Sequence, residues 1–436
     1  MEVSLIDILN AREERVLLQQ KMLQKYSCPV ISFTMNIAGP MKNTPLIERG
    51  FQAGLDALYS KLPPQAIKSK HIDMACTGCT ALLAVESDAS TLKGICVSIE
   101  DCHPLGRLFD MDVLDINGVK LERQNQRGCM VCGAPGRVCA SQRLHCVEQL
   151  QTVTNCILRK HFAAADREYI ANLAVNSLID EVNTTPKPGL VDQRNNGSHR
   201  DMTLQLFYAS AAALRPYFDE CVKIGQESAL HSPSDTFPLL RNAGQQAENA
   251  MYEATGGVNT HKGIIYTMGI LCGCLGRLWQ PDAPFASTED ILSECRKMVA
   301  PSSAEDLKNA IGSTAGERCY LNYGIGGIRA EVAAGLPSVR EIGLPYFEKA
   351  LSNGFNKNDA GAVALLHLIA GVEDTNLYHR GGEEGAKWAS NAAMALLPSP
   401  TKAAITSLDD AFMERKLSPG GCADLLAVTY FLHALK

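Results

Sequence analysis

Five stretches of the sequence each combine glycine or proline with an acid, an amide or a histidine, and most of them also contain a cation. They are TPKPGLVDQRNNGSHRDM (185–202), GGVNTHKG (256–263), YGIGGIRAEVAAGLP (323–337), EDTNLYHRGG (373–382) and LSPGGCADLLA (417–427). A polyphosphate bound with Mg²⁺ needs this mixture, because the metal takes hard oxygen ligands and cations neutralise the remaining phosphate charge. Glycines before a helix also leave backbone N–H groups available to an anion. These stretches predict a binding site for a polyphosphate and magnesium.

A simpler interpretation is open for any single stretch. Asp, Asn and Ser commonly cap the N-terminus of a helix, and Gly commonly follows its C-terminus. Histidines such as His199 and His261 can also be hydrogen-bonded core residues. Five such stretches in one helical region, with more cations than caps require, favour the binding site.

A second candidate site is in the N-terminal third, in GRLFDMDVLD (106–115). Asp110 and Asp112 are two positions apart on a predicted strand, so both side chains lie on one face. Paired carboxylates on a strand suit Mg²⁺ in nucleotidyl transfer, where the metal bridges phosphates and activates a hydroxyl. The alternative for a lone pair of this kind is a solvated strand face.

Cysteines suggest a third site. Cys129, Cys132, Cys139 and Cys146 are near one another, together with His145. The first spacing is typical of zinc, whereas the second, Cys-x₆-Cys, is longer than in most zinc sites. The prediction is structural Zn²⁺ on Cys129, Cys132 and Cys139, with buried thiols as the alternative. A weaker Cys-x₂-Cys pair in ACTGC could complete such a site or form a redox pair.

The elements that must position these residues change in character along the chain. Alternating patterns predict strands at 28–38 and 94–100 after an opening helix, and Asn117-Gly118 predicts a hairpin turn. After residue 165, apolar residues recur at helical spacing. The predicted fold class is multidomain, with an α+β domain followed by an all-α domain. Helices are predicted after 165 at 203–228, 263–279, 360–371, 383–396, 406–417 and 421–435.

Composition agrees with a two-part chain. Of 436 residues, 46% are hydrophobic and the net charge is −6, which argues against a nucleic-acid partner. Residues 1–160 hold 18 Lys and Arg against 16 Asp and Glu, whereas residues 161–436 hold 23 against 31. No export signal or membrane span is recognised, so we expect a soluble, cytoplasmic protein whose sixteen cysteines are mainly reduced.

TPKPGLVD, NNGSHRDM, GVNTHKG, DTNLYHRGG and LSPGGCADLLA resemble, in order over 165–436, the motifs of triphosphoribosyl-dephospho-CoA synthase. The resemblance implies transfer of the ribosyl-triphosphate of ATP to the ribose 2′-hydroxyl of 3′-dephospho-CoA, with release of adenine. It implies Mg²⁺ and acid–base roles for Asp192, Asp374 and Asp424. Substrate-binding residues implied by the same motifs are Lys187, Asn196, His199, Arg200, Asn259, His261, Lys262, Arg380, Gly420 and Gly421.

GRLFDMDV, RGCMVCGAPGRVCASQRLH (127–145) and NIAGPMKNTP (36–45) are similar to citrate lyase holo-acyl-carrier-protein synthase, over about residues 1–155. This resemblance implies that the triphosphoribosyl precursor is joined to a serine of the citrate lyase acyl-carrier (γ) subunit, releasing diphosphate. Asp110 and Asp112 would bind Mg²⁺ in an α+β, nucleotidyltransferase-like fold. Candidates for phosphate or carrier contacts are Lys42, Arg107, Arg127, Arg137 and Arg143.

Two other functions remain open on the sequence. A Mg²⁺-dependent ADP-ribosyl-type hydrolase also has aspartate-rich helical loops, and it would use water in place of the 2′-hydroxyl. The other function is that the cysteine-rich domain is only a zinc-stabilised docking module for the lyase subunit. In that case, carrier binding would survive loss of Asp110 and Asp112.

Overall fold

The computed structural model describes residues 2–436 except 309–310 and 313–314, and it divides into two compact units. Unit 1 comprises Met1–Ala165 with Gln280–Pro284, and unit 2 comprises Asp166–Trp279 with Phe285–Lys436. The division falls inside one long helix, α5 (Val147–Asn183). The predicted domain boundary at residue 160 lies in the same helix.

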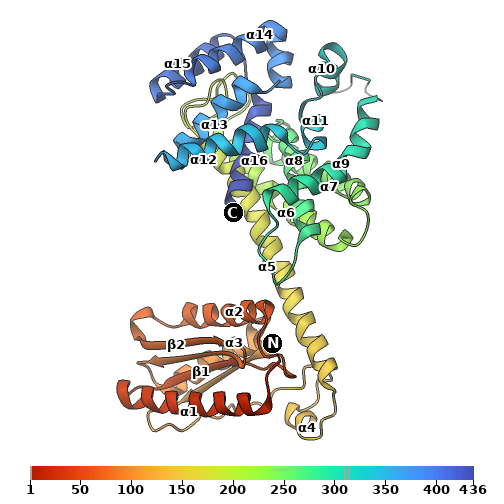
Figure 1. Cartoon of the computed structure of the whole chain (residues 1–436). Helices are drawn as coiled ribbons and strands as arrows, with labels where there is room; N and C mark the ends of the chain where they lie inside the picture. The colour runs from red at the N-terminus through yellow and green to blue at the C-terminus, as the bar shows by residue number, and fades with distance from the viewer. Residues whose placement is uncertain (1, 309–310, 313–314) are drawn as a thin grey trace. The chain divides into compact units, whose positions relative to one another are not determined.

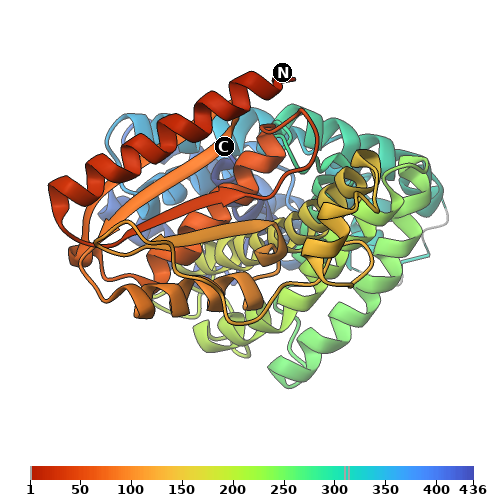
Figure 2. The same cartoon turned by 90° about the horizontal axis from the view of Figure 1, so that it is seen from below.

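Unit 1 is built on a four-stranded antiparallel sheet in the order β2-β3-β1-β4. Helices α1 and α2 lie on opposite faces of this sheet (Figures 1 and 2). Phe33 of β1 stacks on Phe51 of α2 with ring centroids 4.7 Å apart. The bounds are α1 Leu5–Tyr26, β1 Val30–Met35, α2 Pro45–Lys61, β2 Ile67–Ala75, β3 Gly78–Val85, α3 Ala89–Cys102, β4 Phe109–Leu114 and α4 Gly136–Ser141.

The register of the sheet assigns the acid pair to one face. In the β1–β4 ladder, Ser32 is opposite Asp112 and Thr34 is opposite Asp110. Gln19 of α1 donates a hydrogen bond to Ser32 Oγ at 2.9 Å. Asp110 and Asp112 therefore lie on the α1 face of edge strand β4, while the alternate residues of β4 are buried on the other face.

Two predictions for unit 1 are corrected. Residues 94–100 form part of α3, not a strand, because Asp88 caps the helix by accepting from Thr91 N–H. Leu92, Cys96 and Ile99 are buried at helical spacing. Strands β2 and β3 were not predicted.

The predicted turn at Asn117-Gly118 is present, but its second strand is not. Gly118 has φ 78°, and Asp115 N–H donates to Val119 O at 2.9 Å. The returning chain makes only an isolated bridge between Leu114 and Lys120. In the described chain, β4 thus stays at the edge of the sheet, where its face remains accessible.

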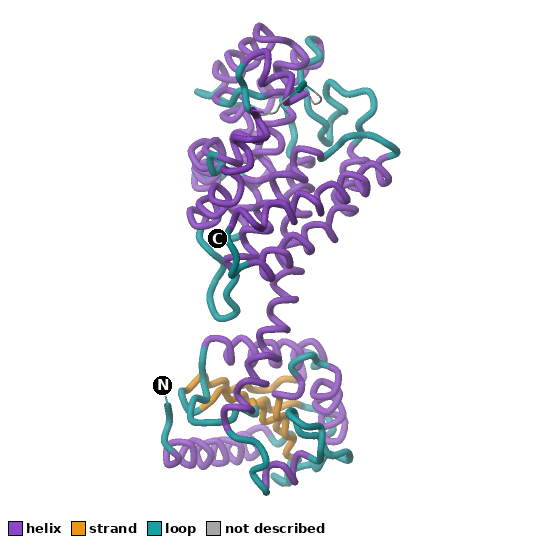
Figure 3. Tube along the Cα trace, turned by 90° about the vertical axis from the view of Figure 1, so that its right-hand side faces the viewer, coloured by secondary structure: helices purple, strands orange, loops and turns teal. Residues whose placement is uncertain are grey.

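Every regular element described after residue 165 is a helix, as predicted, and the strands are confined to unit 1 (Figure 3). The helices are α6 Leu204–Ser228, α7 Pro233–Thr255, α8 Lys262–Leu278, α9 Thr288–Lys308, α10 Ala315–Tyr323, α11 Gly327–Ala333, η3 Val339–Gly343, α12 Leu344–Ser352, α13 Lys357–Gly371, α14 Thr375–Leu396, α15 Lys402–Glu414 and α16 Gly420–Ala434. None of the helices among the described residues is both long and apolar enough to cross a membrane.

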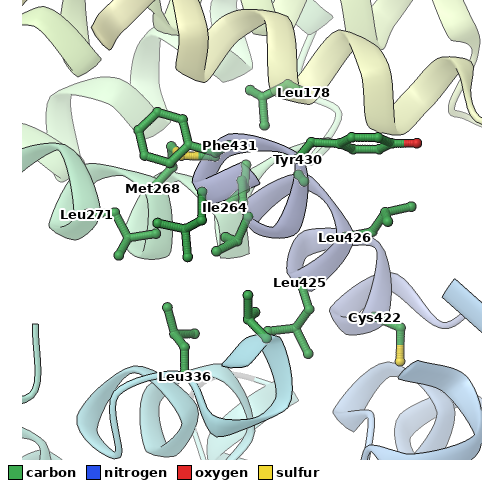
Figure 4. Close-up of a cluster of buried hydrophobic side chains, with 14 of the residues drawn as sticks. Leu178, Ile264, Met268, Leu271, Leu336, Cys422, Leu425, Leu426, Tyr430 and Phe431 are labelled. Carbon is green, nitrogen blue, oxygen red and sulfur yellow. The ribbon is translucent and has the colours of Figure 1, made fainter. Parts of the chain in front are cut away.

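The core of unit 2 is centred on α8 and α16, which are buried on nearly all sides. Leu178 of α5 packs with Ile264 and Met268 of α8 and with Leu425 and Phe431 of α16 in one apolar cluster (Figure 4). Both helices begin at the predicted glycine-containing stretches. Their burial fixes where those N-termini lie, and so positions the candidate site.

Candidate functional site

A cavity of about 1040 Å³ lies within unit 2. This volume is at the upper end of the range for small-molecule pockets and is large enough for two nucleotides. The predicted residues that line the cavity are Lys187, His199, Asn259, His261, Lys262, Asp374, Arg380, Gly420, Gly421 and Asp424. Gly326 and Arg329 also line it, so all five sequence stretches contribute to one concave surface.

Asp374 holds two helix N-termini together at this surface. Its Oδ1 accepts from Asn376 N–H at 2.7 Å in the first turn of α14, and its Oδ2 accepts from Cys422 N–H at 2.8 Å in the first turn of α16. A Cβ at Gly421 would stand 3.1 Å from Asp374 Oδ2, so glycine permits this close approach. Burial raises the pKa of Asp374, while the N–H donors oppose that rise. The capping interpretation thus holds for Asp374.

Asp424 differs, because no described residue donates a hydrogen bond to its carboxylate. Burial raises its pKa well above the usual range, and the charges of Glu181 and Asp374 raise it further. Its Oδ2 lies only 2.1 Å from where a Cβ would stand on Gly263, so glycine is needed opposite it. A desolvated carboxylate on a cavity wall, without a protein partner, is suited to bind a cation or accept a proton.

Glu181 is a cavity residue that the sequence prediction missed. Its carboxylate pairs with Lys187 Nζ at 2.5 Å, and Lys187 Nζ also donates to the Glu181 carbonyl at 2.8 Å. Both side chains are buried, and burial raises the pKa of Glu181. Glu181 follows Leu178 by three positions and so lies on the apolar face of α5. An acid on that face was the feature of the sequence that could have identified Glu181 as a site residue. Other lining groups outside the prediction include Glu248, Tyr252 and Glu331.

Asp192 supports the loop and does not line the cavity. Its carboxylate accepts from the N–H groups of Lys187 (2.9 Å), Arg194 (2.7 Å) and Asn195 (3.1 Å). These bonds use both oxygens and fix the turn that begins at Lys187. Through these bonds, Asp192 holds the turn that positions Lys187.

The predicted substrate-binding cations differ in the hydrogen bonds and ion pairs that they make with other protein groups. Arg380 donates to His199 Nδ1 at 3.2 Å, and His199 Nε2 contacts Ser418 Oγ at 2.8 Å. Lys262 pairs with Glu248 at 2.8 Å. Burial, followed by the Arg380 charge, lowers the pKa of His199 to about 4, which keeps it neutral near pH 7. Asn259 accepts from Lys262 N–H at 3.2 Å, whereas Asn196 and Arg200 are exposed and outside the cavity wall.

His261 gives the stability of unit 2 a pH dependence. It contacts Ser210 Oγ at 2.6 Å, and burial lowers its pKa to about 3, with a smaller contribution from Lys187. A histidine in the unfolded chain titrates near 6.5, so below that pH only the unfolded state takes up the proton. The stability that neutral His261 contributes is full above the unfolded pKa and is lost as pH falls. We expect a loss of about 2 kcal/mol between pH ~7.5 and pH ~5.

Thermal unfolding at the two pH values measures this loss. The His261→Gln variant cannot titrate at this position, so its Tm should fall less on acidification than that of the wild type. Equal falls in the two proteins would contradict the assignment.

In unit 1, cations surround the acid pair. Lys120 Nζ lies 2.6 Å from Asp112, and Lys93 Nζ lies 4.0 Å from it. Desolvation and then the Asp112 charge raise the pKa of Asp110, whereas Lys120, Arg127 and Arg15 lower it. The sequence prediction missed Lys93, Lys120 and Arg15, which come from three separate segments. Two carboxylates beside several cations fit a metal with its bound phosphates.

Three predicted substrate contacts in unit 1 already hold the backbone. Lys42 Nζ donates to Ile37 O at 2.5 Å. Arg127 donates to Phe109 O at 2.6 Å and to Gly106 O, and Arg107 donates to Gly128 O. Arg127 and Arg107 thus join the start of β4 to the segment that leads into the cysteines. Arg137 and Arg143 are exposed.

The predicted cysteines converge, and His145 joins them. The ligand atoms of Cys129, Cys132, Cys139 and His145 lie within 4.8 Å of one another. Cys146 is not part of this group. Elsewhere in the described chain, no set of three or more acids, histidines or cysteines reaches this spacing.

The matched families define the class: a two-unit transferase acting on nucleotide substrates. Residues 167–436 match the family model of ATP:dephospho-CoA triphosphoribosyl transferase, and residues 3–161 match that of apo-citrate lyase phosphoribosyl-dephospho-CoA transferase. Protein CitXG of Haemophilus influenzae is 34% identical over 99% of this chain and 96% of that protein. Protein CitXG of Leuconostoc mesenteroides subsp. cremoris is 30% identical over 99% and 97%.

A single-function relative matches unit 2. The 2-(5''-triphosphoribosyl)-3'-dephosphocoenzyme-A synthase of Klebsiella pneumoniae is 38% identical over 61% of this chain and 91% of that protein. The chain belongs to the CitXG family, in which the two transferases are fused. It is a bifunctional enzyme of citrate lyase prosthetic-group biosynthesis, as its sequence motifs predicted, and the hydrolase alternative is not favoured.

Proposed function

We propose that residues 161–436 convert ATP and 3′-dephospho-CoA to 2′-(5''-triphosphoribosyl)-3′-dephospho-CoA and adenine. The observation that supports this most directly is the unpartnered Asp424 carboxylate on the wall of a cavity of about 1040 Å³. Breaking the N-glycosidic bond builds positive charge on the ribose, which a nearby carboxylate stabilises. The incoming 2′-hydroxyl must also lose a proton. Asp424 is placed to serve either need or to bind Mg²⁺.

The triphosphate stays on the transferred group, so this site must hold it without cleaving it. Lys262 and Arg380 line the cavity and are our candidates for contacts with the phosphates. Asp424 would hold Mg²⁺, which would neutralise further phosphate charge. Asn259 and His261 are candidates for the ribose or the adenine. Lys187 is neutralised by Glu181, and we propose that Asp192 and Asp374 act by positioning the surrounding loops.

We propose that residues 1–160 transfer the product to a serine of the citrate lyase acyl-carrier (γ) subunit and release diphosphate. Asp110 and Asp112 would hold Mg²⁺, and this ion would supply Lewis-acid activation for the serine hydroxyl and neutralise phosphate charge. Lys93, Lys120 and Arg15 supply the cations beside them. The paired acids on an edge strand support our proposal that this unit works like a nucleotidyltransferase. We further propose that the cysteine cluster binds structural Zn²⁺, because thiolate and imidazole ligands suit that metal.

The first experiment is incubation of the full chain with ATP, Mg²⁺ and 3′-dephospho-CoA, followed by mass spectrometry. We expect adenine to appear only with 3′-dephospho-CoA, together with a CoA derivative that gains one triphosphoribosyl group. Apo acyl-carrier subunit added afterwards should gain the group and release diphosphate. Adenine or ribose phosphate formed without 3′-dephospho-CoA would instead support the hydrolase.

A further inference from the structure

The cysteine-rich segment lacks a hydrophobic core. Between residues 121 and 150, Cys139 is the one buried residue. The only helix within 121–146 is the six-residue α4. Segments this poor in buried apolar surface usually depend on a disulfide or a metal for a fixed conformation. All cysteines of the chain are free thiols, which leaves a metal.

Four ligand atoms are arranged for one ion. Cys132 Sγ lies 3.4 Å from Cys139 Sγ, and His145 Nε2 lies 3.3 Å from Cys132 Sγ. A tetrahedral zinc site with Zn–S bonds of about 2.3 Å separates its ligand atoms by roughly 3.5–4 Å, so these spacings need little adjustment. His145 thereby takes the fourth position, which the sequence left open between His145, Cys146 and the ACTGC pair.

The backbone around Cys129 holds its sulfur in a tight turn. Val131 N–H donates to Cys129 Sγ at 3.4 Å, and Gly133, with φ 76°, lets the chain turn back directly after Cys132. This turn keeps the Cys129 sulfur close to those of Cys132 and Cys139.

The cluster is tied to the strand that bears the acid pair. Arg127, two residues before Cys129, donates to Phe109 O at 2.6 Å, and Phe109 directly precedes Asp110. Arg107 donates to Gly128 O in the opposite direction. Gly136 N–H donates to Arg127 O at 3.1 Å, which closes the cysteine turn onto the same arginine. The conformation of residues 127–136 thus determines how Arg127 holds the start of β4.

We propose that Cys129, Cys132, Cys139 and His145 bind one Zn²⁺ and that this ion fixes the loop through which Arg127 positions Asp110. The transfer step then depends on zinc, whereas the adenine-releasing step does not. The dependence rests on the proposed function of residues 1–160, but the metal site itself does not. Loss of zinc is expected to slow transfer by about 10- to 100-fold, the usual effect of residues that orient a site from outside it.

The metal site is tested by the zinc content of the purified full chain, measured by elemental mass spectrometry. We expect about one zinc per chain in the wild type. Cys132→Ser and His145→Ala should lose most of it, and His145→Cys, which keeps a ligand, should retain it. Cys146→Ser is the matched control and should bind zinc like the wild type. A zinc-free wild type, or full zinc in His145→Ala, would overturn the ligand assignment.

The positioning role is tested on the same proteins. Transfer to the carrier subunit is measured with pre-formed triphosphoribosyl precursor, and adenine release is measured separately. In Cys132→Ser, transfer should be about 10- to 100-fold slower than in the wild type, and adenine release should be unchanged. Residues 121–146 should become more susceptible to protease. Unchanged transfer in a zinc-free variant would overturn the coupling. If the wild type itself fails to transfer, the proposed function fails, while the zinc measurement still decides the metal site.

Discussion

Replacing Asp424 by asparagine is expected to slow adenine release by about 100-fold or more, because a carboxylate that handles a proton or developing charge contributes on this scale. The structure also predicts an effect on stability. Burial and the charges of Glu181 and Asp374 already disfavour the ionised form of Asp424, so a neutral amide at this position forfeits no stabilising ion pair. The variant should therefore unfold at the same temperature as the wild type or higher. A slow enzyme with unchanged or raised Tm separates a functional role from a structural one.

A second substitution displaces the same carboxylate without removing it. In Gly263→Ala, the new Cβ would stand 2.1 Å from Asp424 Oδ2, so the carboxylate must turn away. We expect adenine release to fall by about tenfold or more. Gly244→Ala is the matched control, because its Cβ would meet nothing closer than Tyr217 Oη at 3.4 Å. Asp235→Asn is the control for loss of one negative charge, because Asp235 is an exposed residue in the first turn of α7. Wild-type rates in both Asp424→Asn and Gly263→Ala would exclude this carboxylate from the reaction.

Replacing Asp110 and Asp112 together by asparagine is expected to reduce transfer to the carrier subunit by about 1000-fold or more. Both carboxylates lie on one accessible face of β4. Without them, the cations Lys93 and Lys120 remain at this face, and they repel a metal ion. Adenine release, which we assign to unit 2, should stay unchanged. The two activities are compared on one protein preparation, with the precursor supplied for the transfer assay.

Asp56→Asn controls for removal of an exposed carboxylate from the same unit. It lies on α2, on the opposite face of the sheet, and should transfer at the wild-type rate. If the double variant still transfers, the pair is a solvated strand face and unit 1 acts through other residues. A docking module would leave transfer untouched in the double variant, so loss of transfer with carrier binding retained would show that the two acids act in the reaction itself.

Local sequence patterns predicted much of the fold. The two wrong predictions arose where a short pattern is compatible with more than one structure. The helices of unit 2 follow apolar spacing that a single element already displays. Residues 94–100 were misassigned because a short apolar run fits either period, and the Asp88 cap that settles it lies six residues upstream. The second strand at Asn117-Gly118 was wrong because a turn signal does not determine how far the returning chain pairs.

By itself, the sequence determined the two-part architecture, the shared face of Asp110 and Asp112, and the motifs from which the family and its reactions were predicted. These depend on periodicity and on residues close together in the chain. Tertiary structure alone decided which polar atoms remain unpaired. Asp409, 220 positions later, accepts a hydrogen bond from Gly189 N–H and so holds the loop. In the same loop, Asp192 accepts a hydrogen bond from Lys187 N–H. Folding likewise brings Glu181 to the cavity and His145 to the cysteines. Some of the donors that fix a carboxylate come from distant segments, as Cys422 N–H does for Asp374 from 48 positions away, and no local pattern encodes those.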